Sequence, residues 1–339
     1  ISQYGVYGAL SGFHPLVLSA WGSDISTDPQ ESRITDFLVR FALKKADMVH
    51  TGDEVGRRRL MELGCDPGKI FVQQWGTDTN QFSPKARSKA LRRSLGIDDG
   101  YSVLCARWWF SQYRVDVLVK AMPLVLKKIP SVKCIMLGGG PLEPELKELA
   151  RKLGVYENMV FVGKVPKNEM PKYLASVDVY VDTASDYRVG AAGNILVARG
   201  GGGMGQITRE AMACGTPQIL SDNINVRLGT WFQGLAYKQL DHRDLAEKIV
   251  HLLRNEELRR EIGEKSRKVA LEICDLEKTM KQWETVYHEL KSSAKLEKTA
   301  KSFLVFTAFS FLYLVRTVTV WLKVKAYTSK RKSFERVIS

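Results

Sequence analysis

The residues best suited to chemistry lie in a glycine-rich stretch that leads into a short helical pattern. Residues 200–205 are all glycine except Met204. Glycines let backbone N–H groups approach an anion closely, and a helix N-terminus adds a partial positive charge. The stretch therefore suits a diphosphate, although a glycine run is also typical of a surface loop.

Glu210 lies in the first turns of the helix that follows. Its neighbours, Ala211 to Cys214, are small and apolar, Gly215 ends the helix, and a strand-like run comes next. A carboxylate in this place can accept hydrogen bonds from a ribose diol. An acid near a helix N-terminus is also favoured by the helix dipole alone, so both interpretations stand.

Arg107 directly follows an apolar run that predicts a buried strand. Ligands collect at the carboxyl ends of parallel strands, which favours a ligand contact over a surface ion pair. No metal site is predicted, because the acids and histidines lack ligand spacing. These are Asp178, Asp182, Asp186, His14, His50, His242, His251 and His288.

Strand-like apolar runs alternate with amphipathic helices from Leu16 to about residue 274, which predicts parallel sheets flanked by helices in an α/β fold. One helix is expected over 142–153, with Gly154 as its C-cap, and another over 276–290. The expected strands lie at 16–20, 48–50, 69–72, 102–105, 134–137, 160–162, 177–181 and 218–220.

Four segments are predicted. Residues 1–84 form a partial N-terminal α/β domain, and residues 85–275 form a second α/β domain. A helix over 276–290 and a basic apolar tail over 291–339 follow. The chain begins at Ile1 without a methionine and soon enters a strand-like run, so we expect upstream sequence to be missing and the first domain to be incomplete.

The tail holds much of the positive charge. The net charge is +14, and residues 291–339 contain eleven lysines and arginines but two acids, so a nucleic-acid-binding body is not indicated. Residues 303–315 are almost wholly apolar, and Arg316 interrupts the run. A spanning helix and an interfacial helix both fit, and packing on the body is the alternative; we expect membrane attachment. The five scattered cysteines indicate reduced thiols in the cytoplasm, which places the chain at the inner face of the cell membrane.

Residues 210–217, Glu-Ala-Met-Ala-Cys-Gly-Thr-Pro, strongly resemble the motif of retaining glycosyltransferase family 4. Matching stretches follow the family's order over about residues 13–290, at 69–84, 106–121, 137–142 and 161–165. The resemblance implies a GT-B fold of two Rossmann-like domains and retaining transfer of a hexosyl group from a nucleotide sugar. It also implies that no metal or other cofactor is needed.

The resemblance also implies roles for individual residues. Arg107 would grip the donor diphosphate, Glu210 would hold the ribose, and Asp24 with Ser23 would face the cleft. The residues implied to line the phosphates or frame the base are Gly203, Met204, Gly205, Gly138, Val162, Gly163 and Lys164.

Three positions depart from the family pattern. Gly202 stands where the family often has a first glutamate, and Trp21 stands where it has a histidine that holds sugar hydroxyls. The family's second phosphate-binding lysine is absent near Tyr113, where Arg114 either substitutes or faces solvent.

The expected function is therefore transfer of a hexosyl group to an acceptor hydroxyl, on a sugar or on a lipid-linked or cell-envelope glycan. The alternative is a non-catalytic nucleotide-sugar-binding or degenerate family member, which Gly202 and Trp21 favour. A nicotinamide-dependent oxidoreductase is disfavoured, because residues 138–141 do not supply the glycine fingerprint of a dinucleotide site.

Overall fold

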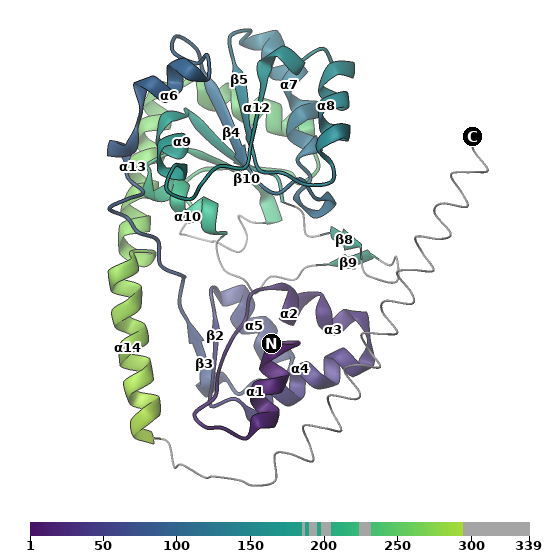
Figure 1. The fold of residues 1–339 in the computed structure, drawn as a ribbon, viewed down its shortest axis with the longest axis vertical. Coiled ribbons are helices and arrows are strands. Elements are labelled where there is room, and N and C mark those ends of the chain that lie inside the picture. The colour runs from purple at the N-terminus through teal and green to yellow at the C-terminus, as the bar shows by residue number, and fades with distance from the viewer. Residues whose placement is uncertain (185–186, 190–194, 198–204, 224–231, 294–339) are drawn as a thin grey trace, which may run out of the picture. The chain divides into compact units, whose positions relative to one another are not determined.

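A computed structural model describes residues 1–184, 187–189, 195–197, 205–223 and 232–293 of the chain (Figure 1). Two compact units are present. The first is built on residues 1–73, and the second on residues 74–184, 205–223 and 232–284.

The first unit contains a three-stranded parallel sheet of order β1-β2-β3. Its strands are β1 (Val17–Ser19), β2 (Met48–Thr51) and β3 (Ile70–Val72), and its helices are α1 (Tyr4–Ser11), α2 (Ser23–Ser26), α3 (Asp28–Glu31), α4 (Arg33–Lys45) and α5 (Glu54–Glu62). The core forms where the apolar faces of α1 and α4 meet the sheet, with Leu38, Val39 and Val49 buried. Hydrophobic burial of this kind stabilises a small α/β layer.

The second unit is built on a six-stranded sheet of order β11-β10-β7-β4-β5-β6, in which every pairing is parallel. The strands are β4 (Ser102–Ala106), β5 (Lys133–Leu137), β6 (Met159–Gly163), β7 (Val179–Asp182), β10 (Gln218–Ser221) and β11 (Leu235–Tyr237). Central strands such as β4 and β7 are buried along their whole length. This explains why residues 103–106 and 179–181 are continuous apolar runs in the sequence.

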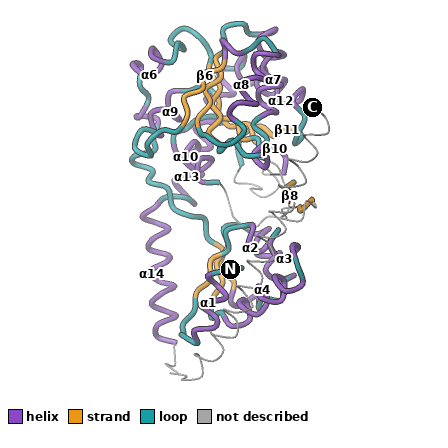
Figure 2. Tube along the Cα trace, turned by 45° about the vertical axis from the view of Figure 1, so that its right-hand side comes forward, coloured by secondary structure: helices purple, strands orange, loops and turns teal. Residues whose placement is uncertain are grey.

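Helices cover both faces of this sheet (Figures 1 and 2). On one face α7 (Asp116–Lys128), α8 (Glu143–Lys152) and α12 (His242–Arg254) enclose one apolar cluster. On the other face α9 (Met170–Ser176), α10 (Gln206–Ala213) and α13 (Glu256–Ile273) enclose a second. Helix α6 (Lys89–Ser94) precedes β4, and α14 (Leu276–Ser293) ends the described chain.

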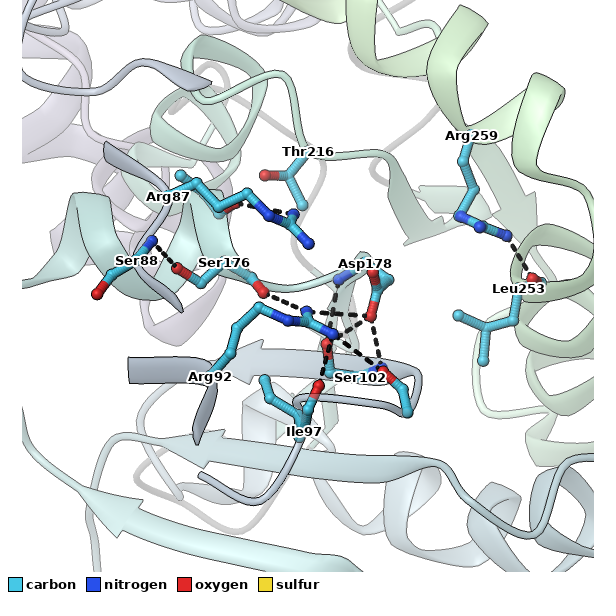
Figure 3. Close-up of polar contacts among 12 residues, drawn as sticks. Arg87, Ser88, Arg92, Ile97, Ser102, Ser176, Asp178, Thr216, Leu253 and Arg259 are labelled. Carbon is cyan, nitrogen blue, oxygen red and sulfur yellow. Dashed lines mark hydrogen bonds and ion pairs between the residues drawn. The ribbon is translucent and has the colours of Figure 1, made fainter. Parts of the chain in front are cut away.

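A buried polar cluster fixes the amino ends of β4 and β7 (Figure 3). Arg92 of α6 donates to the carbonyl oxygens of Ser176 at 2.7 Å and Ile97 at 2.6 Å, and it lies 3.6 Å from the Asp178 carboxylate. Asp178 in turn accepts from both the backbone N and Oγ of Ser102, at 2.8 and 2.7 Å. The cluster therefore ties α6 and the end of α9 to the edge of the sheet opposite the carboxyl ends.

The predicted elements are confirmed where the structure describes them. Each expected strand is present within a few residues, the helix expected over 142–153 is α8, and Gly154 follows it with φ +68°. The helix expected over 276–290 is α14, which continues to Ser293. All five cysteines are buried and unpaired. A short antiparallel pair, β8 (Tyr187–Val189) with β9 (Ile195–Val197), was not expected.

Candidate active site

The parallel sheet of the second unit brings the carboxyl ends of β4, β5 and β7 together. Arg107 follows β4, Gly138 follows β5, and Asp182 ends β7. Strand β4 pairs with both β5 and β7, so all three residues meet at one edge of the sheet. This edge is where open α/β sheets bind ligands.

Arg107 forms a bidentate ion pair with Asp182. Its Nε donates to Asp182 Oδ1 at 2.9 Å, its Nη2 donates to Oδ2, and its guanidinium lies 5.7 Å from the ring centroid of Tyr113. Burial lowers the pKa of Arg107, but the Asp182 carboxylate together with Tyr180 and Tyr113 raises it overall, so the guanidinium stays charged. Among the described residues, Nη1 has no hydrogen-bond partner.

Backbone packing around Gly138 holds the strand ends close. Gly138 has φ +134°, and a Cβ atom there would lie 2.0 Å from the Arg107 carbonyl oxygen. Arg107 N donates to Leu137 O at 3.2 Å, and Gly138 N donates to Gly163 O at 2.9 Å. Only glycine fits this approach, because any side chain would displace the backbone that carries Arg107.

Helix α10 supplies Glu210, as the helical pattern predicts. The Glu210 side chain is buried, and its Oε1 accepts from Gln206 Nε2 at 2.8 Å one turn earlier. Burial raises the pKa of Glu210, while the Gln206 hydrogen bond and Lys167 oppose the rise. Gly205 caps the helix, and a Cβ atom there would lie 2.9 Å from Arg107 Nη2. The start of α10 therefore lies beside the guanidinium.

These groups line one cavity of about 390 Å³ within the second unit. Its cationic side chains are Arg107, Lys164 and Lys167, and Glu210 is its acid. The remaining lining consists of Ala106, Trp108, Tyr113, Leu137, Gly138, Val165, Met170, Gln206 and Ile207. A cavity with converging cations, a buried carboxylate and apolar walls can hold an anionic ligand that also carries a flat or apolar part.

The structure places the predicted site residues in three groups. Arg107, Gly138, Lys164 and Glu210 line the cavity, with Gly205 beside Arg107. Four predicted residues, Arg114, Val162, Gly163 and Asp24, are not part of the cavity lining. Gly202, Gly203 and Met204 lie outside the described residues. The functional roles assigned to all of them stay predictions.

Arg114 is engaged by its own helix. It has φ 44°, and its Nε and Nη2 donate to the two oxygens of Asp116 at 3.0 and 3.1 Å. Asp116 also accepts from Lys120 Nζ at 2.8 Å. The Arg114 guanidinium is therefore paired with Asp116 at the start of α7, and its partly exposed side chain is not part of the cavity lining. Both alternatives for Arg114, substitution for the family's lysine and exposure to solvent, stay predictions.

Val162 and Gly163 form the end of β6, next to the glycine turn of β5, and contribute backbone there. Asp24 lies on α2 of the first unit, where it is buried. Its Oδ1 accepts from the backbone N of Trp21 at 3.0 Å and of Gly22 at 2.9 Å, so it caps this turn. Trp21 itself is exposed.

Sequence reasoning missed several contributors to the cavity, and the polar or aromatic ones include Trp108, Lys167 and Gln206. The signal for Gln206 was present, because it lies four residues before Glu210 on the same helix face. Trp108 directly follows Arg107, and Trp109 directly follows Trp108. The sequence does not tell which of the two tryptophans is buried. Lys167 lies in a loop with no distinguishing pattern.

Metal-binding clusters and membrane-spanning helices are both absent from the part of the chain that the structure describes. No group of three or more His, Cys, Asp or Glu side chains is arranged to hold a metal there. None of the described helices combines the length and the apolar character needed to cross a bilayer. The predicted membrane tail, apart from residues 291–293, lies outside the described ranges.

Comparison with protein families gives two matches. The family described as glycosyl transferases group 1 matches residues 88–269, which is more than half of the chain. The family described as glycosyl transferase 4-like matches residues 1–52. The two matches occupy the second and the first unit respectively.

Among curated proteins, a GDP-mannose-dependent alpha-(1-6)-phosphatidylinositol monomannoside mannosyltransferase of Mycolicibacterium smegmatis is 32% identical over 145 residues, which is 42% of this chain and 36% of that protein. The chain thus aligns with about a third of that relative's length. An N-acetyl-alpha-D-glucosaminyl L-malate synthase of Bacillus anthracis is 23% identical, over 81% of this chain and 68% of that protein.

Among solved structures, Anabaena HepE in complex with UDP superposes with a TM-score of 0.72 at 18% identity, covering 86% of this chain and 77% of that one. A sucrose-phosphate synthase from Thermosynechococcus elongatus superposes with a TM-score of 0.67 at 20% identity, covering 83% and 69%. At these identities the likeness shows a shared fold.

Proposed function

The chain belongs to the group 1 glycosyltransferases and has their GT-B fold, and from this premise we propose that it moves a hexosyl group from a nucleotide-diphosphate sugar to an acceptor hydroxyl, with retention of anomeric configuration. One observation carries the proposal. Arg107 and Glu210, which lie far apart in the sequence, line the same cavity at the carboxyl edge of the parallel sheet.

In the proposed complex Arg107 holds the diphosphate. Its Nε and Nη2 are fixed by Asp182, which leaves Nη1 for a phosphate oxygen. When the glycosidic bond to the leaving phosphate breaks, negative charge develops on that phosphate, and a fixed guanidinium offsets it at little reorganisation cost. Lys164 and Lys167 add two further positive charges to the same cavity.

Glu210 binds the ribose in this proposal. Gln206 occupies its Oε1, and among the described residues no partner hydrogen-bonds Oε2. A carboxylate oxygen can accept from both hydroxyls of a ribose diol. The cationic side chains supply the countercharge that a metal ion supplies in other transferases, so we expect transfer to proceed without a bound metal or other cofactor.

The acceptor is proposed to be a lipid-linked or cell-envelope glycan. The Mycolicibacterium relative is described as acting on a phosphatidylinositol monomannoside, and the basic apolar tail of this chain suits attachment to the inner face of a membrane. An enzyme attached to the membrane encounters a membrane-bound acceptor by diffusion in the plane of the bilayer.

A two-stage experiment tests the proposal. The full chain is first titrated with UDP, GDP and ADP by calorimetry, and at least one is expected to bind. The corresponding radiolabelled nucleotide hexoses are then incubated with the chain and a lipid extract, and label is expected to enter the lipid phase. Failure of all three nucleotides to bind would refute the donor site assigned to Arg107 and Glu210.

The second candidate is a non-catalytic nucleotide-sugar-binding protein. Trp21 replaces the expected histidine, and Gly202 replaces the expected first glutamate, so two sugar contacts of the family are absent from the sequence. Nucleotide binding without transfer or donor hydrolysis, in a protein that includes any upstream sequence, would favour this second candidate.

A further inference from the structure

Trp108 is a large aromatic residue that lies outside the hydrophobic core. It is 49% exposed, whereas its neighbour Trp109 is 1% exposed and packs edge-on against Phe161 with ring centroids 5.9 Å apart. Trp109 therefore belongs to the core, and Trp108 does not. The exposed part of the Trp108 indole is accessible to a ligand, and it offers a large, flat apolar surface for such a contact.

The backbone holds Trp108 in a fixed place. On one side Arg107 N donates to Leu137 O at 3.2 Å, and on the other Trp109 N donates to Gly139 O at 3.0 Å. Leu142 N also donates to Trp109 O at 3.2 Å. The segment is thus bound on both sides to the glycine turn after β5, which pre-organises the indole for a ligand.

The indole lines the same cavity as Arg107 and Glu210. Lys164 Nζ lies 5.1 Å from the Trp108 ring centroid, which is a cation–π geometry and means that the ammonium stands over a ring face. The stem of Lys164 passes over Gly139, where a Cβ atom would lie 3.2 Å from Lys164 Cε. One face of Trp108 is therefore covered by a flexible, exposed side chain.

A nucleoside diphosphate has three chemical parts, and the cavity offers three matching groups. Arg107 suits the diphosphate and Glu210 suits the ribose, as proposed above. Of the two aromatic residues in the lining, Tyr113 has the Arg107 guanidinium over its ring, which leaves Trp108 for the base. Bases stack on aromatic side chains whatever their hydrogen-bonding pattern, because every base has a π face.

We propose that Trp108 is the stacking platform for the donor nucleobase, on the ring face that Lys164 covers in the free protein. Lys164 leaves this face when the base binds. The inference rests on the proposed donor site and adds the residue that recognises the base as a flat ring.

The test compares nucleotides with a base-free probe. UDP, GDP, ADP and inorganic diphosphate are titrated into the full chain and into its Trp108→Leu variant by calorimetry. Trp108→Leu is expected to weaken the nucleotide that binds by about 5- to 150-fold, which corresponds to about 1–3 kcal/mol of stacking. Diphosphate affinity is expected to stay within about twofold, because diphosphate has no base to stack.

Three variants separate stacking from other effects. Trp108→Phe keeps a π face and is expected to retain most of the nucleotide affinity. Phe110→Leu is the matched control, because Phe110 is a 41% exposed aromatic in the same loop that does not line the cavity. Lys164→Met removes the competing cation, so the ratio of nucleotide to diphosphate affinity should not fall.

The outcomes are distinct. If no nucleotide binds the wild-type chain, the proposed donor site fails and this inference fails with it. If a nucleotide binds but Trp108→Leu leaves its affinity unchanged, the donor site stands and the stacking platform is refuted. An equal loss of nucleotide and diphosphate affinity would also refute stacking, since the variant would then act on the site as a whole. A fall in the affinity ratio in Lys164→Met would assign base recognition to Lys164 instead.

Discussion

Replacing Glu210 with glutamine should separate the binding role of this residue from its effect on stability. Glu210 is 3% exposed, and Gln206 is its hydrogen-bond partner among the described residues. A hydrogen bond to a charged group contributes about 1.5–3 kcal/mol. Loss of the charged acceptor for a ribose diol should therefore weaken nucleoside diphosphate binding by about 10- to 150-fold.

The free energy of unfolding should respond in the opposite direction to nucleotide affinity, because Glu210→Gln should not lower it at neutral pH. Burial raises the folded-state pKa of Glu210 above its ordinary value of 4.5. The folded state then binds more protons than the unfolded state, so the free energy of unfolding falls as pH rises from about 4.5 through the raised pKa. Glu210→Gln removes this dependence, and at neutral pH the variant should be as stable as the wild-type protein or more stable.

The assay pairs calorimetry with urea denaturation between pH 4 and pH 8, values chosen to bracket the ordinary carboxyl pKa. Wild-type affinity should fall as Glu210 is protonated, and the affinity of Glu210→Gln should lack that step. Glu261→Gln is the control, because Glu261 is an exposed acid on α13 paired with Lys265. A variant that binds the nucleotide as well as the wild-type protein, or that loses affinity only because it unfolds, would refute the ribose-binding role.

Further outcomes are expected elsewhere in the chain. Arg107→Met should lose nucleotide binding and about 3–5 kcal/mol of stability, because it leaves the buried Asp182 carboxylate without its countercharge; adding Asp182→Leu should restore much of the stability in urea denaturation but not the binding. Arg92→Met should cost a similar amount of stability yet leave calorimetric nucleotide affinity unchanged, since its cluster lies at the opposite edge of the sheet (Figure 3). The full chain should sediment with anionic liposomes, and a chain lacking residues 294–339 should not; equal behaviour would refute membrane attachment by the tail. EDTA should leave hexosyl transfer unaffected, and a loss restored by a divalent cation would show that the cationic side chains are not sufficient.

The fold was largely predictable because its central strands are buried on both faces. A run such as residues 103–106 is continuously apolar because it lies in the middle of a parallel sheet, and that makes it visible in the sequence. Helix α8 was predictable for the complementary reason, since its apolar residues recur at helical spacing and Gly154 follows. Pairings such as β8 with β9 involve strands of three residues, which are too short to produce a periodic pattern.

Individual residues of the candidate site could be predicted from the sequence, but their arrangement in space could not. Arg107 and Glu210 could each be selected from the chemistry of a strand end or a helix start, because those are local features. Their surroundings depend on strand order, which no local pattern encodes. Arg114 shows the same limit: the family resemblance left phosphate contact and solvent exposure both open, and its pairing with Asp116 could not be read from the sequence because it depends on the αL backbone at Arg114.

The Arg107–Asp182 pair explains how the cavity can hold an anion although a buried carboxylate lies beside its principal cation. Asp182 offsets part of the charge of Arg107, so at long range the pair attracts a diphosphate less than a lone guanidinium would, although Nη1 can still donate to a phosphate oxygen. The carboxylate instead fixes Nε and Nη2, and it is itself held by the backbone N of Ala184 at 3.1 Å. Orientation of Nη1 is what this arrangement provides. The net positive charge must then come from Lys164 and Lys167, whose flexible side chains can follow the phosphates as the bond to the sugar breaks. On this view, neutralising either lysine should weaken diphosphate binding in proportion to the charge that is removed. Neutralising Arg107 should remove the directed hydrogen bond from Nη1 to a phosphate oxygen.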